Sequence, residues 1–398
     1  MSLENVSHIY KGLLQRNRAF ASFKSDELET IYQDITNSSI SNDIEILDPM
    51  SGYGGGMTYF GNKGFSTYNI ELNPPSHYWQ ILINPANNVL ILSTIQQLLD
   101  VKRWPSIKET YSLTDELFSE PAIVHVKSLF KKIITVTNNR TIAIAILLPF
   151  VARFANYQRN DTNFTHFKQG GICSFVGWEE DFTEYLIALK DKVDVQYENF
   201  QNHTNVLCNF LDFHTEKQFK CFVTSPPYPN YRDYSKIFKI ENWVLKNILQ
   251  EDQSNLQFMI GSDVIKGKSY GEINSEVANK FLNKLLEKSK KLSKKSKYDI
   301  EVYYYPYFSM YFYQIQQAYL KLNQLLDSDA LGYIVVNNNI TRDIQIPVGE
   351  AICDMFSNMG YEYSIIDESE ISHLGNLRRH AKRINSRHIR YIVKVWKK

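Results

Sequence analysis

Apolar residues along this chain follow two spacings in turn, and the alternation predicts strands separated by helices. Short β-type runs that end in turn residues lie at 44–47, 65–70, 205–209, 221–223, 332–336 and 390–396. Between these runs, apolar residues recur three and four positions apart, which is the spacing of one helix face. Strands that alternate with helices predict an α/β fold with a doubly wound, mostly parallel sheet.

The interval between the second and third of these strands is far longer than a simple crossover. Within it, 122–136 and 141–156 have helical spacing, whereas 157–171 has the composition of a long polar loop. We therefore expect a mostly helical insertion. The predicted organisation is a helical lead-in at 1–41, a core made of 42–75 and 203–398, and the insertion at 76–202.

The last third of the chain adds a basic helix and an aromatic segment. A lysine-rich amphipathic helix is predicted at 275–296, and its lysines either form a solvated face or contact phosphates. The tyrosines of 298–313 are expected mainly to pack, and this segment leads into a helix that ends near Leu325. Residues 327–329 predict a turn before the strand at 332–336.

Composition narrows the class of protein. The 398 residues can bury a large core, and 43% hydrophobic with 22% charged residues is typical of a globular chain. A net charge of +1 neither requires nor excludes nucleic acid. The four cysteines form no CxxC pair and the nine histidines form no HxxxH, so we expect no disulfide framework and no metal site. The longest apolar stretch is about half of the roughly 20 residues that a membrane span needs, and no signal peptide is recognisable, so we expect a cytoplasmic protein.

A glycine-rich turn follows the first strand. The sequence at 48–54 is Asp-Pro-Met-Ser-Gly-Tyr-Gly, in which Gly52 and Gly54 let the backbone approach a bound group closely. Glu71 lies 17 residues after Gly54, near the position of a carboxylate that binds ribose hydroxyls. A strand, a glycine turn, a helix and a second strand ending in an acid predict a nucleotide-binding βαβ unit.

The charge of this turn does not suit a phosphate. The turn has no Walker lysine, and Asp48 adds negative charge at the place where a phosphate would bind. An acid at this position favours a cationic or zwitterionic cofactor.

A second motif, Thr-Ser-Pro-Pro-Tyr at 224–228, follows the fourth strand. Its two prolines fix φ and remove two amide donors, so the chain leaves the strand in a stiff loop. The Ser225 hydroxyl precedes the prolines and the Tyr228 ring follows them. Acceptor oxygens beside an aromatic ring are suited to hold a planar ring that carries an NH2 group.

Together, in this order and at strand ends, the two motifs resemble those of amino-methylating DNA methyltransferases, over roughly 42–75 and 203–397. The resemblance implies a class I, Rossmann-like core that binds S-adenosylmethionine, with Glu71 on the ribose and Asp212 at the adenine amino group. The cofactor-binding residues that it implies are Asp48, Ser51, Gly52, Gly54, Glu71, Asp212 and Thr224. The catalytic residues that it implies are Ser225, Pro226, Pro227 and Tyr228.

The resemblance also implies the reaction. The amine of a flipped base would donate its hydrogens to Ser225 Oγ and the Pro226 carbonyl, while Tyr228 stacks on the base. Serine before Pro-Pro-Tyr is similar to the cytosine-N4 group of the family, so we favour cytosine N4 and keep adenine N6 as the alternative. Two further alternatives are an RNA guanine-amine methyltransferase and a DNA-binding specificity module with a silent core.

The partners that the resemblance implies are double-stranded DNA and a cognate restriction endonuclease as a separate chain. Only 12 residues separate Asp212 from Thr224, so the recognition region often found between those strands in the family has no room there. We expect the insertion to cover or read the DNA instead. The predicted DNA contacts are Arg159, Lys168, Asn230, Arg378, Arg379, Arg383 and Arg387, and Arg390 extends the same C-terminal basic cluster.

Overall fold

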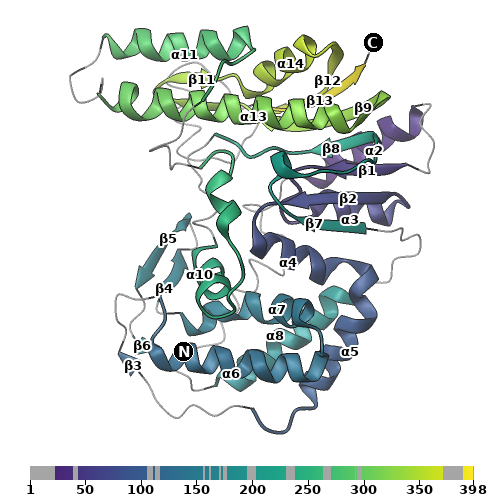
Figure 1. The fold of residues 1–398 in the computed structure, drawn as a ribbon, viewed down its shortest axis with the longest axis vertical. Coiled ribbons are helices and arrows are strands. Elements are labelled where there is room, and N and C mark those ends of the chain that lie inside the picture. The colour runs from purple at the N-terminus through teal and green to yellow at the C-terminus, as the bar shows by residue number, and fades with distance from the viewer. Residues whose placement is uncertain are drawn as a thin grey trace.

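The computed structural model describes most of the chain, and Figure 1 shows how its elements are arranged. The described residues are 23–38, 44–104, 111–112, 117–155, 157–160, 163–169, 172–173, 177–194, 203–229, 238–262, 270–291, 293, 298–370 and 389–397. At 111–112, at 370 and between 157 and 173, the backbone alone is described.

A seven-stranded sheet forms the centre of the described fold. In spatial order its strands are β12 (Tyr361–Glu370), β13 (Ile389–Lys397), β9 (Leu326–Asn337), β8 (Phe219–Thr224), β1 (Glu45–Asp48), β2 (Ser66–Glu71) and β7 (His203–Leu207). Strand β13 runs antiparallel to β9 and β12, and the other described pairings in this sheet are parallel. Because helices cover both faces, the predicted α/β fold with a doubly wound, mostly parallel sheet is confirmed.

The order of the strands reverses between β1 and β8, in the middle of the sheet. From β1 the chain proceeds outward to β2 and then to β7, whereas from β8 it proceeds the other way to β9. Connections that leave neighbouring parallel strands in opposite directions create the crevice in which ligands of such sheets bind. The carboxyl ends of β1, β2 and β8 lie at this edge.

Two apolar layers hold helices against the sheet. One face carries α11 (Glu276–Ser289), α13 (Tyr305–Leu325) and α14 (Val348–Asn358), and the other carries α2 (Ser25–Asn37) and α3 (Gly55–Asn62). On α2 the buried residues Leu28, Ile31 and Ile35 recur three and four positions apart, so one stripe of the helix faces the sheet. Figure 1 shows α11, α13 and α14 together at one end of the molecule.

A helical unit beside the sheet has an apolar core of its own (Figure 1). Its helices are α4 (Pro74–Ile83), α5 (Asn88–Leu99), α6 (Glu120–Thr137), α7 (Arg140–Leu147), α8 (Trp178–Val193) and α10 (Lys239–Asn247). Helix α10 comes from the chain between β8 and β9, outside 76–202. Arg140 fastens the segment after α10, because its guanidinium donates to Glu251 Oε1 at 2.8 Å and to Leu249 O at 2.6 Å. The chain that follows the Pro-Pro loop is therefore part of the helical unit.

Two segments that we expected to be irregular are strands. The prediction of a polar loop at 157–171 is wrong, because β4 (Tyr157–Asn160) and β5 (Asn163–Gln169) pair antiparallel. Tyrosine, phenylalanine and threonine favour strands there despite their polar neighbours. The turn predicted at 327–329 lies inside β9 instead. It falls at a break in the pairing, because the register with β8 passes from Phe219–Leu326 to Cys221–Leu331.

The remaining described elements are short. They are η1 (Pro85–Asn87), β3 (Tyr111–Ser112), η2 (Leu148–Phe154), β6 (Ile172–Cys173), η3 (Phe210–Asp212), η4 (Ser254–Phe258), η5 (Ile300–Tyr304), β10 (Asn339–Thr341) and β11 (Ile344–Ile346). Strand β3 pairs with β6, and β10 pairs with β11. Among the helices that the structure describes, none has both the length and the apolar composition needed to cross a membrane.

One member of the predicted basic surface is buried instead. Arg390, in β13, forms an ion pair with Glu27 of α2, and its Nη2 donates to Glu27 Oε2 at 2.7 Å. The two side chains are 9% and 3% exposed. The prediction that Arg390 contacts DNA is therefore wrong, because a buried and paired guanidinium does not reach a phosphate. The pair instead fastens α2 to the last strand of the sheet.

Candidate cofactor and catalytic site

The polar residues of the two motifs lie at the carboxyl edge of the sheet. Asp48 ends β1 and Glu71 ends the neighbouring strand β2. Asp212 follows β7, which is joined to β2 there by a hydrogen bond from the Cys208 amide to Glu71 O (3.0 Å). Thr224 ends β8, on the other side of β1. Residues far apart in the sequence thus meet on both sides of the point where the strand order reverses, between β1 and β8.

The glycine turn is fixed by hydrogen bonds to β2 and α4. Ser51 donates from both its amide (3.0 Å) and its hydroxyl (3.1 Å) to the Ile70 carbonyl. Gln80 Nε2 donates to Ser51 Oγ at 2.8 Å and to Gly52 O at 2.6 Å. Gly52 and Gly54 have φ values of 53° and 74°, which side chains disfavour. The Ser51 side chain is therefore part of the turn's own support, and Gln80 is a support that the sequence did not indicate.

Asp48 and Glu71 are carboxyl groups that burial keeps from ionising easily. They are 5% and 8% exposed. Burial raises the pKa of Asp48 to about 7, against a hydrogen bond from the Met50 amide (3.2 Å) that lowers it. Burial likewise raises the pKa of Glu71 to about 8, against a hydrogen bond from the Asn73 amide (2.7 Å), and the charge of Asp48 raises it further. Such acids favour a ligand that brings hydrogen-bond donors or positive charge.

Asp212 differs from these two acids because it is exposed. It lies in η3, directly after β7. The Asn209 side chain orients it, since Asn209 Nδ2 donates to Asp212 Oδ2 at 2.9 Å. The predicted adenine-binding acid is thus held in place and accessible to a ligand from solvent.

Without ligand, the protein is expected to lose stability as the pH rises from about 5 to about 8. The folded pKa of Glu71, about 8, exceeds its ordinary value of 4.5, so the unfolded chain releases this proton first and a rising pH favours unfolding. In Glu71→Gln this contribution is absent. We expect its Tm to exceed that of the wild type by about 3–6 °C at pH 8 and to match it at pH 5. Thermal unfolding at both pH values measures this, with the exposed Glu184→Gln as control. Equal pH dependence in Glu71→Gln and the wild type would contradict the assignment.

The Ser-Pro-Pro-Tyr loop is closed by hydroxyl groups. Ser225 is 7% exposed, and its Oγ lies 2.7 Å from the Tyr228 hydroxyl. The same hydroxyl donates to the Val335 carbonyl of β9 at 3.1 Å. Burial raises the pKa of Tyr228, so the phenol keeps its proton. The Tyr228 residue is nevertheless partly exposed, and it packs against the apolar core that α13 lines.

Helix α13 supports this loop from the face that carries α11 and α14. The Tyr311 hydroxyl donates to Pro227 O at 3.0 Å, and the Tyr307 hydroxyl donates to Gly261 O at 3.2 Å. Both tyrosines are buried, which agrees with the prediction that the aromatic segment packs. The role of Tyr311 in holding the loop was not predicted, although a spacing of four residues already placed it on one helix face with Tyr307.

The glycine turn and the residue that precedes α10 meet through aromatic rings. The rings of Tyr53, in the glycine turn, and Phe238, directly before α10, have centroids 5.6 Å apart. Phe238 is buried, and α10 itself packs in the core of the helical unit. The glycine turn is therefore in contact with the helical unit.

No protein-family model matches this chain, and no curated protein matches it. The likeness to methyltransferases therefore rests on the two motifs and on the geometry that brings them together.

The predicted DNA contacts are only partly within the described chain. Arg159 and Lys168 lie on β4 and β5, where Arg159 pairs with Phe167 and Lys168 pairs with Gln158. Both therefore belong to the same hairpin. The other predicted contacts lie outside the described residues; they are Asn230, Arg378, Arg379, Arg383 and Arg387.

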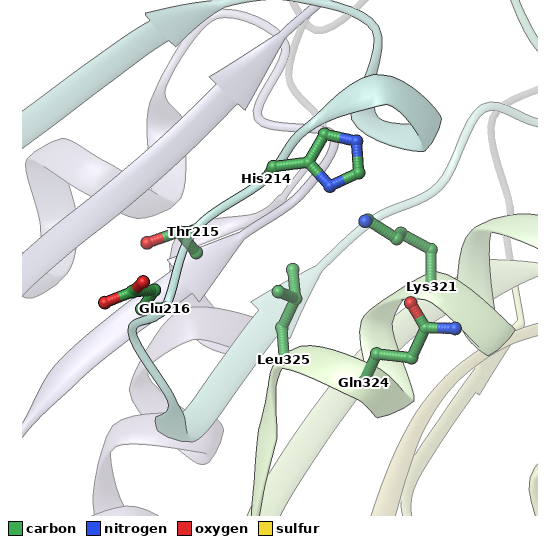
Figure 2. A pocket seen from close by; sticks show the side chains of 6 residues that line it. All are labelled: His214, Thr215, Glu216, Lys321, Gln324 and Leu325. Atoms are coloured by element: carbon green, nitrogen blue, oxygen red, sulfur yellow. The ribbon is translucent and has the colours of Figure 1, made fainter.

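A cavity of about 460 Å³ lies at the opposite edge of the sheet (Figure 2). Its lining residues are His214, Thr215, Glu216, Lys321, Gln324 and Leu325. It opens beside the first residues of β8 and β9, and its polar side chains are all partly or fully exposed. The C-terminal carbonyls of α13 add negative charge next to Lys321, which weakens any attraction for an anion. Among the described residues, no group of three or more potential ligand side chains suits a metal ion.

Proposed function

We propose that this chain is an S-adenosylmethionine-dependent methyltransferase that modifies the exocyclic amine of a flipped base in double-stranded DNA, with cytosine N4 as the acceptor. The observation that carries the proposal is the meeting of the two motifs at one edge of the sheet. The buried acids end β1 and β2, and the Ser225–Tyr228 loop follows the adjacent strand β8. A methyl donor held by the acids and an amine held by the loop would face each other there.

The acids at this edge suit the proposed cofactor. Glu71 would accept hydrogen bonds from the ribose hydroxyls, and Asp212 from the adenine amino group. Asp48 favours positive charge near the glycine turn, where a phosphate would be repelled. When bound, the cofactor supplies an electrophilic methyl group on a sulfonium centre.

The work of the chain's own residues is to position the amine. Its nitrogen lone pair is delocalised into the base and is a poor nucleophile. Acceptors at Ser225 Oγ and the Pro226 carbonyl would hold the two N–H groups and direct the lone pair toward the methyl donor. The amine would take up the methyl group that the sulfonium supplies and lose one N–H proton to solvent, while Ser225 Oγ and the Pro226 carbonyl hold it in place. No covalent bond to the protein is needed.

Ser225 is the residue on which the choice of cytosine N4 rests. The alternatives are adenine N6, a guanine amine of RNA and a silent DNA-binding module. Serine favours cytosine N4 through the resemblance, and adenine N6 presents a similar amine to the same acceptors. A guanine amine of RNA is a third acceptor class. A silent DNA-binding module is disfavoured, since two buried acids that reduce the stability of the ligand-free fold are better explained by a ligand that uses them. Protection of DNA from a separate restriction endonuclease is the role that such an activity commonly has.

The hairpin of β4 and β5 is the proposed contact surface for DNA phosphates. Two alanine substitutions, at Arg159 and Lys168, are expected to weaken duplex binding and to lower the slope of log affinity against log salt by about 1–2, because each lost phosphate contact releases about one counterion fewer. Affinity measured over a salt series tests this. The matched control replaces two exposed lysines of α11, Lys280 and Lys284, and is expected to change little. Unchanged affinity and slope in the hairpin variant would remove the hairpin from the interface.

Label transfer from tritiated S-adenosylmethionine tests the proposed activity. We expect the purified chain to label unmethylated double-stranded DNA and to leave an equal mass of RNA unlabelled. Label in RNA alone would favour the guanine-amine alternative. Label in neither, together with no cofactor binding in calorimetry, would favour the silent module.

A further inference from the structure

Three oxygen atoms form a short chain at the end of β8. They belong to the Val335 carbonyl, the Tyr228 hydroxyl and the Ser225 hydroxyl. The Tyr228 oxygen lies 3.1 Å from Val335 O and 2.7 Å from Ser225 Oγ. In the proposed reaction, Ser225 Oγ accepts a hydrogen bond from the substrate amine. The directions of these two hydrogen bonds therefore decide whether Ser225 Oγ is free to accept.

The directions follow from the number of protons. A carbonyl oxygen can only accept, whereas each hydroxyl has one proton to donate. The Tyr228 proton must therefore go to Val335 O, because two oxygens at 3.1 Å without a proton between them would repel each other. The bond between the two hydroxyls must then be made by the other proton. Ser225 donates to the Tyr228 oxygen, and its proton points away from the place of the amine.

The sequence explains why this carbonyl is open to Tyr228. The ladder between β8 and β9 ends where Thr224 is opposite Ile334, and Val335 is the next residue of β9. Beyond Ser225 the chain continues with two prolines, which have no amide proton to extend the ladder. The Tyr228 hydroxyl supplies the missing donor. The prolines thus create the acceptor that orients Tyr228.

The charged groups around Tyr228 are consistent with a protonated phenol. Burial raises its pKa; Arg390 on β13 and the Ser225 hydrogen bond lower it, and Glu27 on α2 raises it. Arg390 and Glu27 form the buried ion pair described above, so their charges largely offset each other at this point. The phenol therefore keeps the single proton that the assignment requires.

We propose that the Tyr228 hydroxyl is a positioning group that holds Ser225 Oγ as an acceptor, with both of its lone pairs free for the N–H groups of the substrate amine. A serine hydroxyl that rotates freely would also present its proton to the amine, which has no accessible acceptor of its own. Fixing that proton on Tyr228 gives a neutral serine the acceptor character that an amide or carboxylate oxygen has permanently. This inference rests on the proposed methyl transfer and adds to it a role for the hydroxyl of Tyr228, separate from any stacking by its ring.

The variant Tyr228→Phe isolates the hydroxyl, because it keeps the aromatic ring. We expect kcat to fall about 10- to 30-fold, with KM for DNA and the Kd for the cofactor within about twofold of the wild type. The effect is expected to be coupled to Ser225. Where Ser225→Ala alone costs about 100-fold, it is expected to cost less than about tenfold in the Tyr228→Phe background, because the oriented acceptor is already lost.

A tyrosine of α13 that bonds to the same loop is the matched control. Tyr311→Phe also removes a hydroxyl group that donates to the loop, but that hydroxyl bonds to Pro227 O and not to Ser225. Its effect on kcat is expected to add to that of Ser225→Ala without coupling. Full activity in Tyr228→Phe, or additivity between Tyr228→Phe and Ser225→Ala, would overturn the inference while the proposed function stands. A wild-type chain that binds the cofactor and methylates no nucleic acid would overturn the proposed function, and this inference with it.

Discussion

Replacing Ser225 with alanine is expected to lower kcat for methyl transfer by at least about 100-fold. Ser225 Oγ lies at the carboxyl end of β8 and is held by Tyr228, so its loss removes an oriented acceptor rather than a structural support. The Kd for S-adenosylmethionine is expected to stay within about threefold, because the acids proposed to bind it lie on β1, β2 and beyond β7. Single-turnover rates and calorimetry, measured on the same preparation, separate the two effects.

The control for this variant is a serine far from the carboxyl edge. Ser328 lies near the start of β9 and is exposed, so Ser328→Ala is expected to leave kcat and Kd unchanged. If Ser225→Ala kept more than about a third of the wild-type kcat, the assignment of the catalytic loop would be untenable.

Replacing Glu71 with glutamine is expected to weaken cofactor binding by about 10- to 100-fold. The carboxylate of Glu71 would make charge-assisted hydrogen bonds to the ribose, each contributing about 1.5–3 kcal/mol, and the amide offers only one neutral acceptor oxygen. Isothermal titration calorimetry at pH 8 measures the change. The control is Glu184→Gln, on the outer surface of α8, which is expected to bind like the wild type.

The Glu71 carboxyl group, together with Asp48, is also expected to make cofactor binding depend on pH. Because the pKa values of Asp48 and Glu71 are raised to about 7 and about 8, the ligand-free acids are largely protonated at pH 6 and must lose protons when they bind a cation and hydroxyl donors. Affinity is therefore expected to rise between pH 6 and pH 8, with protons released on binding. In Glu71→Gln the rise should be smaller. Affinity that falls over this pH range, or Glu71→Gln that matches the wild type, would contradict the role of Glu71.

The sheet and the positions of the motif residues could be predicted because they depend on local signals. The strands that end at Asp48, Glu71 and Thr224 are short apolar runs closed by glycine, proline or acid residues. Parallel strands place their carboxyl ends at a common edge, so the meeting of the motifs follows from the strand assignments alone. The fold class is therefore contained in the pattern of apolar runs.

The supports of the site could not be predicted, because they depend on long-range contacts. Gln80 holds the glycine turn from α4, and Tyr311 holds the Pro-Pro loop from a helix that is 84 residues further along the chain. Arg390 was assigned to a basic surface from its neighbours in sequence, whereas its partner, Glu27, is 363 residues away. A residue's neighbours in the sequence do not show which side of a strand it faces.

The full extent of the helical unit could not be predicted either. Its boundaries were set from one continuous stretch of helical spacing, but α10, which follows the catalytic loop, packs into the same apolar core. Nothing in the local sequence of α10 indicates that association, because an apolar helix face does not identify its partner. The consequence for function is direct, since the ring contact between Tyr53 and Phe238 joins the glycine turn to α10 of the helical unit.

Identification of the methylated nucleoside is the most direct test of the proposed function. Unmethylated double-stranded DNA is incubated with the wild-type chain and S-adenosylmethionine, digested to nucleosides and analysed by mass spectrometry, with Ser225→Ala in parallel. We predict N4-methyldeoxycytidine from the wild type and at least about 100-fold less from the variant. N6-methyldeoxyadenosine alone would correct the base. The absence of any methylated nucleoside, from a wild-type chain that binds the cofactor, would contradict the proposed function.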